Sequence, residues 1–177
     1  MVAKETRNIV DFYAYWKTDA IKASLDSKRH DFSVFCVNLH HDFNLSTIVR
    51  NCNAFLAKQI FIYGSKRFDR RGCVGTNHYE RLVHLTIDTD LKEFFKQFYV
   101  IGIDNVENAK SIENYEWPTN KHVLICFGEE QLGISKDILN MCQDILYIKM
   151  RGSTRSLNVG CASAITMFHY CSQIHNA

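Results

Sequence analysis

The chain has 177 residues, 46% of them hydrophobic, which suits one compact domain with a sizeable core. Its formal net charge of +2 is too small to indicate a nucleic-acid partner by itself, so the local distribution of cations has to decide. The seven cysteines contain no CxxC pair, which argues against a zinc site and a disulfide framework and for a reducing compartment.

The first 30 residues are predicted to form a helical extension. Ile9, Tyr13, Trp16 and Ala20 recur at helical spacing, so we expect an amphipathic helix over residues 6–25 whose aromatic face packs on the body. A short polar connector follows, and residues 31–177 are then expected to form a single domain. There is no signal-peptide pattern and no apolar run of membrane-spanning length, so we expect a soluble, cytoplasmic protein with no membrane partner.

Six short runs rich in β-branched and aromatic residues follow the extension, and helical patterns separate most of them. Strands that alternate with helices pair in parallel through right-handed crossovers, so the predicted fold class is α/β, a parallel sheet with helices on both faces. The predicted strands are residues 34–39, 59–63, 82–87, 99–103, 123–127 and 145–150.

The helix predicted over residues 44–57 has its apolar residues in one sector of the helical wheel. Asn44 is placed as its N-cap. Arg50 points away from the apolar sector, and for an isolated helix it would be a solvated charge on the outer face.

A basic loop follows the second predicted strand. It carries the cations Lys66, Arg67, Arg70 and Arg71 around the aromatic Phe68. Such a loop suits phosphate binding, with the ring stacked on a base or ribose, but an ordinary solvated loop is an equal alternative. Downstream, Asp90 is predicted to begin a helix whose apolar residues pack on the core.

Three loops sit at the carboxyl ends of predicted strands, over residues 104–106, 128–133 and 151–155. Ligands of open α/β sheets bind where such loops converge. The sequence has no GxGxxG, no Walker-type phosphate loop and no GxSxG elbow. His40, His41 and Asp42 are adjacent on an extended segment and point to opposite faces, so no metal site is predicted.

The last segment, residues 144–165, is predicted to run from a buried strand through a polar loop into a helix. Ser156 is placed as the helix N-cap and Asn158 in the first turn, which is compatible with plain capping. The loop also pairs Arg151 and Arg155 with a glycine and two hydroxyls, which suits an anionic or strongly polar ligand. The pattern alone is compatible both with simple capping of the helix and with a ligand-binding role for this segment.

Three segments in this order resemble the signature motifs of the SpoU, or TrmH-like, branch of the SPOUT RNA methyltransferases. They are residues 44–50 (NLSTIVR), 124–135 (LICFGEEQLGIS) and 148–159 (IKMRGSTRSLNV). Each segment alone is a weak signal, whereas the ordered trio within residues 34–170 is specific.

The resemblance implies an S-adenosylmethionine-dependent RNA 2′-O-ribose methyltransferase, an obligate homodimer and a deep trefoil knot in the C-terminal part. Chain-topology rules argue against a knot by default, and no periodicity could have indicated it. Matched motif by motif, the expected catalytic residues are Asn44, Arg50, Glu130, Ser156 and Asn158. The positions that contact the cofactor through the backbone in such proteins are here Ile103, Gly128, Ile148 and Leu157. Lys66, Arg67, Arg70, Arg71 and Arg155 are the residues assigned to RNA.

Three positions depart from the family pattern. Lys149 stands where proline is usual, Glu129 replaces a small residue, and Gly160 replaces a common serine. These departures bear on cofactor affinity and loop rigidity, and they leave the five polar side chains intact.

The resemblance also changes the interpretation of Arg50, because a helix face turned from its own core can form a dimer contact and reach the partner's cofactor loop. Two alternatives remain, a catalytically inactive knotted dimer that binds RNA through the basic loop, and a base-N-methylating member of the wider group, which the SLN motif disfavours. Transfer RNA is favoured over ribosomal RNA because the chain lacks a large RNA-binding domain.

Overall fold

The computed structural model describes residues 4–5, 7–38, 44–129 and 132–174. In this part of the chain seven parallel strands form one sheet in the order β3-β2-β1-β6-β4-β7-β5, which confirms the α/β prediction. The strands are β1 (Phe32–Asn38), β2 (Ile60–Gly64), β3 (Leu82–Leu85), β4 (Tyr99–Ile103), β5 (Lys110–Ser111), β6 (Val123–Phe127) and β7 (Asp144–Tyr147).

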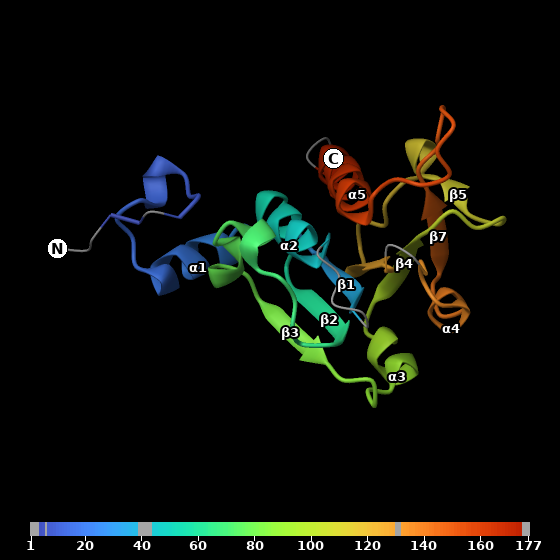
Figure 1. Cartoon of the computed structure of the whole chain (residues 1–177), viewed down its shortest axis with the longest axis horizontal. Helices are drawn as coiled ribbons and strands as arrows, with labels where there is room; N and C mark the ends of the chain where they lie inside the picture. The colour runs from blue at the N-terminus through green and yellow to red at the C-terminus, as the bar shows by residue number, and fades with distance from the viewer. Residues whose placement is uncertain (1–3, 6, 39–43, 130–131, 175–177) are drawn as a thin grey trace.

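Helices cover both faces of this sheet (Figure 1). The long helices α2 (Asn44–Ala54) and α5 (Val159–Ile174) lie on one face, and the short helices α3 (Leu91–Phe95) and α4 (Lys136–Leu139) lie on the other. Three 3-10 turns, η2 (Arg71–Cys73), η3 (Thr76–His78) and η4 (Ile112–Asn114), complete the connections. Among the described residues, no helix is long and apolar enough to cross a membrane.

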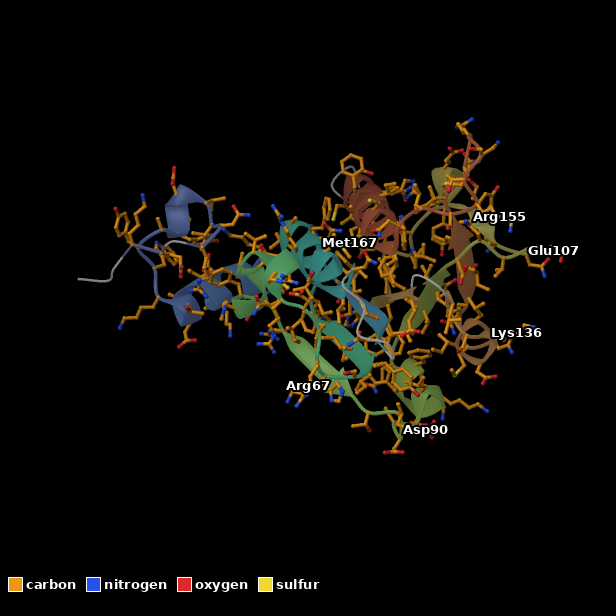
Figure 2. The ribbon with its side chains drawn as sticks, in the orientation of Figure 1. Arg67, Asp90, Glu107, Lys136, Arg155 and Met167 are labelled. Carbon is orange, nitrogen blue, oxygen red and sulfur yellow. The ribbon has the colours of Figure 1, made fainter. Side chains whose placement is uncertain are left out.

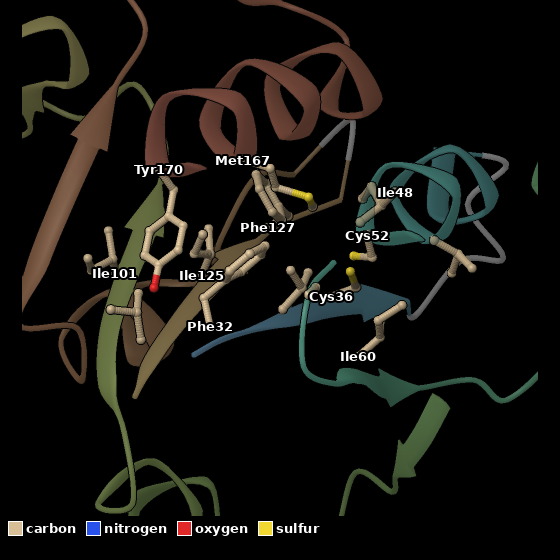
Figure 3. Packing of buried hydrophobic residues seen from close by; sticks show 14 of the residues in the cluster. Phe32, Cys36, Ile48, Cys52, Ile60, Ile101, Ile125, Phe127, Met167 and Tyr170 are labelled. Atoms are coloured by element: carbon tan, nitrogen blue, oxygen red, sulfur yellow. The ribbon is translucent and has the colours of Figure 1, made fainter. Parts of the chain in front are cut away.

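Strand alternation divides the core between the two faces. In β1, Phe32, Val34 and Cys36 belong to the cluster under α2 and α5, whereas Phe35 belongs to the cluster under α3 and α4. Figure 3 shows Met167 and Tyr170 of α5 reaching down onto the first of these clusters. Both faces of the central strands are therefore buried, as a parallel sheet requires.

The N-terminal extension differs from the prediction of one helix over residues 6–25. It consists of the 3-10 turn η1 (Asp11–Tyr13) and the helix α1 (Thr18–Asp26), with Lys17 in an extended conformation between them. The break allows Tyr13 to pack with Ile21 and Tyr79 in a small separate cluster. Part of the predicted aromatic face is uncovered, because Trp16 is 39% exposed.

A buried ion pair fastens this extension to the main body. Arg29 Nη1 donates to Glu80 Oε2 at 2.8 Å, and the two side chains are 3% and 0% exposed. Arg29 also donates to Asp26 Oδ1 and to the Ala57 carbonyl, and Asn53 Nδ2 donates to the other oxygen of Glu80. Burial disfavours the charge and raises the pKa of Glu80, although the guanidinium of Arg29 opposes that rise.

Two predicted strands are too long and one strand was missed. The strand predicted over 82–87 ends at Leu85. The strand predicted over 145–150 ends at Tyr147, because Ile148 and Met150 line a cavity instead of continuing the sheet. The edge strand β5 was missed because its two residues are too short to form a hydrophobic run. The helix after Asp90 is confirmed, since the Asp90 carboxylate accepts hydrogen bonds from the backbone N–H groups of Lys92 and Glu93.

Candidate active site

The start of α5 is fixed by Asn158, and the prediction that Ser156 is its N-cap is wrong. Asn158 Oδ1 accepts hydrogen bonds from the backbone N–H groups of Gly160, at 2.9 Å, and Cys161, at 3.3 Å. These are donors that the first turn of a helix leaves without an intrahelical partner. Ser156 lies two residues before the cap and faces a cavity.

The amide group of Asn158 joins two of the sequence motifs. Its Nδ2 donates to Asn44 Oδ1 at 2.8 Å, although the two residues are 114 positions apart in the chain. Asn44 is buried and is the first residue of α2, and the preceding residues 39–43 lie outside the described part of the chain. The structure therefore brings together two of the residues that the family resemblance assigned to the active site.

A cavity of about 310 Å³ opens beside this pair, at the carboxyl ends of β4, β6 and β7. Its volume lies in the range of small-molecule sites, roughly 300–1,000 Å³. The lining combines apolar side chains with a few polar groups. All four residues expected to contact the cofactor belong to this lining. The lining residues are Ile103, Asp104, Asn105, Phe127, Gly128, Glu129, Leu132, Gly133, Ile148, Met150, Ser156, Leu157, Val159 and Ala162.

One wall of the cavity is a tight turn after β6. The backbones of Glu129 and Gly133 exchange two hydrogen bonds, N–H to carbonyl at 3.1 and 2.9 Å. A Cβ atom at Gly128 would lie 2.1 Å from the Gly133 carbonyl carbon, so this position needs glycine. Gly133 adopts a φ of 65°, a conformation that residues with side chains seldom adopt.

Two residues of the predicted ligand-binding loop after β4, Asp104 and Asn105, hold the cavity loops in place. Asp104 Oδ2 accepts a hydrogen bond from the Ile134 N–H at 2.9 Å, which anchors the turn after β6. Asn105 Nδ2 donates to the Arg155 carbonyl at 2.9 Å, which anchors the loop before α5. Their position at the carboxyl end of a central strand was the available signal, because ligands of such sheets bind there.

The other predicted catalytic residues are placed differently. Arg50 is exposed on α2, as its position on the helical wheel indicated, and it is not among the residues that line the cavity. Glu130 lies outside the described residues, as do His40, His41 and Asp42. Within the described ranges, no group of three or more His, Cys, Asp or Glu side chains is arranged to hold a metal ion.

The basic loop after β2 presents its cations to solvent. Lys66, Arg67, Arg70 and Arg71 are all exposed, and Arg71 is paired with Asp69. Phe68, for which stacking on a base or ribose was one of two alternatives, packs partly buried against the core, with the Arg70 guanidinium 5.7 Å from its ring centre. The ring therefore contributes to the packing of the loop against the core.

The fifth residue assigned to RNA does not join the basic loop within one chain. Arg155 is exposed in the loop before α5. In Figure 2, Arg67 lies on the side of the molecule formed by β2 and β3, whereas Arg155 lies beside β5 and β7, at the opposite edge of the sheet. A single subunit thus carries two distinct basic regions.

The three departures from the family pattern occupy different environments. Gly160 lets α5 approach α2 closely, since a Cβ atom there would lie 2.8 Å from Thr47 Cγ2. Asn51 Nδ2 crosses the same contact and donates to the Gly160 carbonyl at 2.9 Å. Glu129 is buried in the cavity wall, whereas Lys149 is exposed.

A cluster with perturbed pKa values lies at the opposite, amino-terminal end of β7. Asp144 Oδ2 accepts hydrogen bonds from the hydroxyls of Tyr99 and Tyr115, both at 2.7 Å, and Lys110 pairs with Oδ1. Burial opposes the charged form of Asp144, but these donors together lower its pKa. Burial and the hydrogen bond to Asp144 raise the pKa of Tyr115. This cluster lies at the end of β7 away from the cavity and links β7 to the neighbouring strands β4 and β5.

Comparison with known proteins gives one family match, to the SpoU rRNA Methylase family over residues 31–168. Among named relatives, the tRNA (guanosine(18)-2′-O)-methyltransferase of Thermus thermophilus is 28% identical over 157 residues, covering 84% of this chain and 78% of that protein. The enzyme of the same name from Aquifex aeolicus is 25% identical over 154 residues, covering 84% of this chain and 72% of that protein.

Solved structures show the same fold. The A. aeolicus TrmH/SpoU tRNA modifying enzyme superposes with a TM-score of 0.74 at 20% identity, over 90% of this chain and 85% of that one. The SpoU methyltransferase AviRb from Streptomyces viridochromogenes, in complex with AdoMet, gives a TM-score of 0.72 at 20% identity, over 84% of this chain and 60% of that one.

Proposed function

This chain belongs to the SpoU methylase family, and we propose on that basis that it is an S-adenosylmethionine-dependent RNA 2′-O-ribose methyltransferase acting on transfer RNA. The observation that carries the proposal is the cavity at the carboxyl ends of β4, β6 and β7, which draws its walls from two of the three motif segments. The third motif segment, residues 44–50, is linked to the cavity-lining segment 148–159 by the hydrogen bond between Asn44 and Asn158. The names of the relatives support transfer RNA as the substrate.

The cavity fits the proposed cofactor in size and in chemistry. Ile103, Ile148 and Leu157 offer apolar surface for a flat adenine ring, and Gly128 allows close approach of the backbone. When bound, S-adenosylmethionine supplies a methyl group on a positively charged sulfur. The chain's own task is to hold the target ribose in line with that methyl group, and such positioning alone can supply roughly 7–11 kcal/mol of a reaction barrier.

The polar side chains have separate roles in this proposal. Ser156 faces the cavity, where its hydroxyl can donate to or accept from the target ribose. Asn158 caps α5 and bonds Asn44, so this pair sets the position of the loop that carries Ser156. We assign Arg50 to the phosphate beside the target nucleotide, because a guanidinium stays protonated and binds phosphate through its planar fork. The 2′-hydroxyl proton then passes to that phosphate, since a protonated guanidinium has no acceptor site.

We further propose that the active protein is a homodimer built on the outer face of α5. Cys161, Ile165 and Phe168 recur at helical spacing on this face and are exposed, Phe168 at 64%. Arg50 is exposed on α2, the helix that packs against α5. A partner seated on this face brings its own Arg50 toward the cavity, so that each active site draws on both subunits. The knotted C-terminal chain path is implied by membership of the family.

The N-terminal extension, residues 1–30, remains a predicted accessory to the domain that begins at residue 31. The family match begins at that residue, which supports the division. We place the protein in the cytoplasm, with the transfer RNA on which it is proposed to act.

The activity is tested by mapping 2′-O-methylation across total RNA from cells with and without this protein, followed by methyl transfer from labelled S-adenosylmethionine to purified RNA in vitro. We expect one transfer RNA nucleotide to lose its 2′-O-methyl group. Loss of a base methylation would point to the base-N-methylating alternative. Unchanged methylation together with RNA binding would favour the inactive RNA-binding dimer.

The RNA contact is tested on the basic loop. The double variant Arg70→Ala/Arg71→Ala should weaken RNA binding and reduce the slope of log affinity against log salt by about 2, since each phosphate contact contributes about 1. Cofactor affinity should not change. The control is Lys92→Ala/Lys96→Ala, which removes two exposed cations at α3. If the slope falls equally in both double variants, the basic loop is an ordinary solvated loop and not a specific RNA contact.

A further inference from the structure

Asp104 introduces a carboxylate into a cavity whose other lining is mostly uncharged. Of the described residues that line the cavity, Asp104 and Glu129 are the two with charged side chains, and both are acidic. Asp104 directly follows β4, and Ile103 is paired in register with Phe127 of β6, so this carboxylate lies where two central strands end. It is half-buried and therefore accessible from the cavity.

The carboxylate is held in a fixed orientation by two backbone donors. Oδ1 accepts from the Asn105 N–H at 2.7 Å, and Oδ2 accepts from the Ile134 N–H at 2.9 Å. A Cβ atom at Gly133 would lie 2.7 Å from Oδ2, so the turn after β6 closes directly against this oxygen. The side chain thus has little freedom to move, and its acceptor sites are set before any ligand arrives.

Each oxygen keeps acceptor capacity for a ligand. An ionised carboxylate offers about four lone-pair sites on two oxygens, and the two backbone N–H groups use one on each. Acceptor capacity therefore remains on both oxygens, which suits a pair of neighbouring donors. In other α/β proteins, an acidic residue near the carboxyl ends of the strands accepts hydrogen bonds from a ribose hydroxyl of a bound nucleotide.

We propose that Asp104 binds the vicinal hydroxyls of the adenosine ribose of the cofactor, while its bond to Ile134 N keeps the turn after β6 in place. The inference rests on the proposed function, because it takes the cavity as the cofactor site. Asp104 is then a cofactor-contact residue that none of the three motif segments contains.

The test is calorimetry of the full chain with S-adenosylhomocysteine and with its 2′-deoxyribose analogue. The unmodified protein should bind the ribose form about tenfold more tightly, the usual scale for one hydrogen bond to a charged group. Asp104→Ala should bind both ligands with equal affinity. The control Asp88→Asn, in an exposed loop after β3, should keep the tenfold ratio.

A purely structural role predicts a different result. If Asp104 acts only through the turn, Asp104→Ala will weaken both ligands in parallel and retain the tenfold ratio, and the inference is overturned. Should Asp104→Ala fail to fold by circular dichroism, Asp104→Asn keeps the side-chain shape, and its ratio must fall below that of the unmodified protein. An unmodified protein that binds S-adenosylhomocysteine without discrimination refutes the ribose contact alone, whereas one that binds neither ligand refutes the proposed function.

Discussion

Gly160 is the departure from the family pattern whose effect the structure lets us work out. It is the second residue of α5 and is buried against α2. In Gly160→Ala, the added Cβ atom would lie 2.8 Å from Thr47 Cγ2 and 3.1 Å from both Thr47 Cβ and Asn158 Oδ1. Two of these three atoms belong to a β-branched side chain with little rotational freedom, so α5 has to move away from α2.

The expected cost follows from two opposing effects. Overpacking of this kind typically destabilises a protein by about 1–3 kcal/mol. Alanine regains up to about 1 kcal/mol over glycine within a helix, and less in the first turn. The net loss is then about 1–2 kcal/mol, which in a protein of this size lowers Tm by roughly 2–8 °C. Because Asn158 Oδ1 is one of the displaced atoms, methyl transfer should fall as well.

Thermal denaturation of matched variants tests this reasoning. Gly152→Ala is the control, because a Cβ atom there meets no atom within 4 Å, and its stability should change by less than about 0.5 kcal/mol. Thr47→Ser removes the nearest methyl group, so the double variant with Gly160→Ala should recover part of the loss, with a coupling of at least about 0.5 kcal/mol. A Tm for Gly160→Ala at or above that of the unmodified protein, with no coupling to Thr47, would refute the close-packing argument.

Three further predictions concern the anchor of the extension, the sheet edge and the shared site. Glu80→Gln leaves the buried guanidinium of Arg29 without its main counter-charge and should cost about 3 kcal/mol in chemical denaturation; a loss below about 1 kcal/mol would contradict it. The folded state lowers the pKa of Asp144, so its contribution is present above the unfolded pKa of about 4 and is lost as pH falls below it. The stability difference between the unmodified protein and Asp144→Asn should therefore stay constant above about pH 5 and shrink as the pH falls below about 4, and a difference that does not shrink there would disprove the linkage. Co-refolding Arg50→Ala with Asn158→Ala should restore methyl transfer in mixed dimers, because one of the two sites then has both residues; absence of recovery, with heterodimers verified by mass, would place both residues in one subunit.

Local patterns in the sequence were enough to predict most of the secondary structure. The strand over residues 99–103 and the strand over 123–127 were predicted with the bounds that the structure shows, because continuous apolar runs are typical of strands buried on both faces. The helical wheel of α2 correctly placed Arg50 on its exposed face. The cap of α3 at Asp90 was also predicted, because an N-cap depends only on residues within one turn.

The three convergent loops were predicted as well, since parallel strands end at one edge of a sheet. The ordered motifs then identified the family, which the match over residues 31–168 confirmed. What the sequence could not supply was the partner of each polar group inside those loops. Ser156 and Asn158 are equally good N-cap residues by type, and the choice between them depends on where α5 meets α2.

The tertiary structure alone decided the contacts that build the cavity. Asn44 and Asn158 are hydrogen-bonded although 114 positions separate them, and Asp104 and Ile134 are hydrogen-bonded across 30 positions. Neither pairing follows from any local spacing in the sequence. The extension broke at Lys17 for a similar reason: packing of Tyr13 against Tyr79 outweighed the helical periodicity of residues 6–25. Local propensity is worth a few tenths of a kcal/mol per residue, whereas a buried aromatic side chain contributes about 2–3 kcal/mol, so long-range packing prevails where the two disagree.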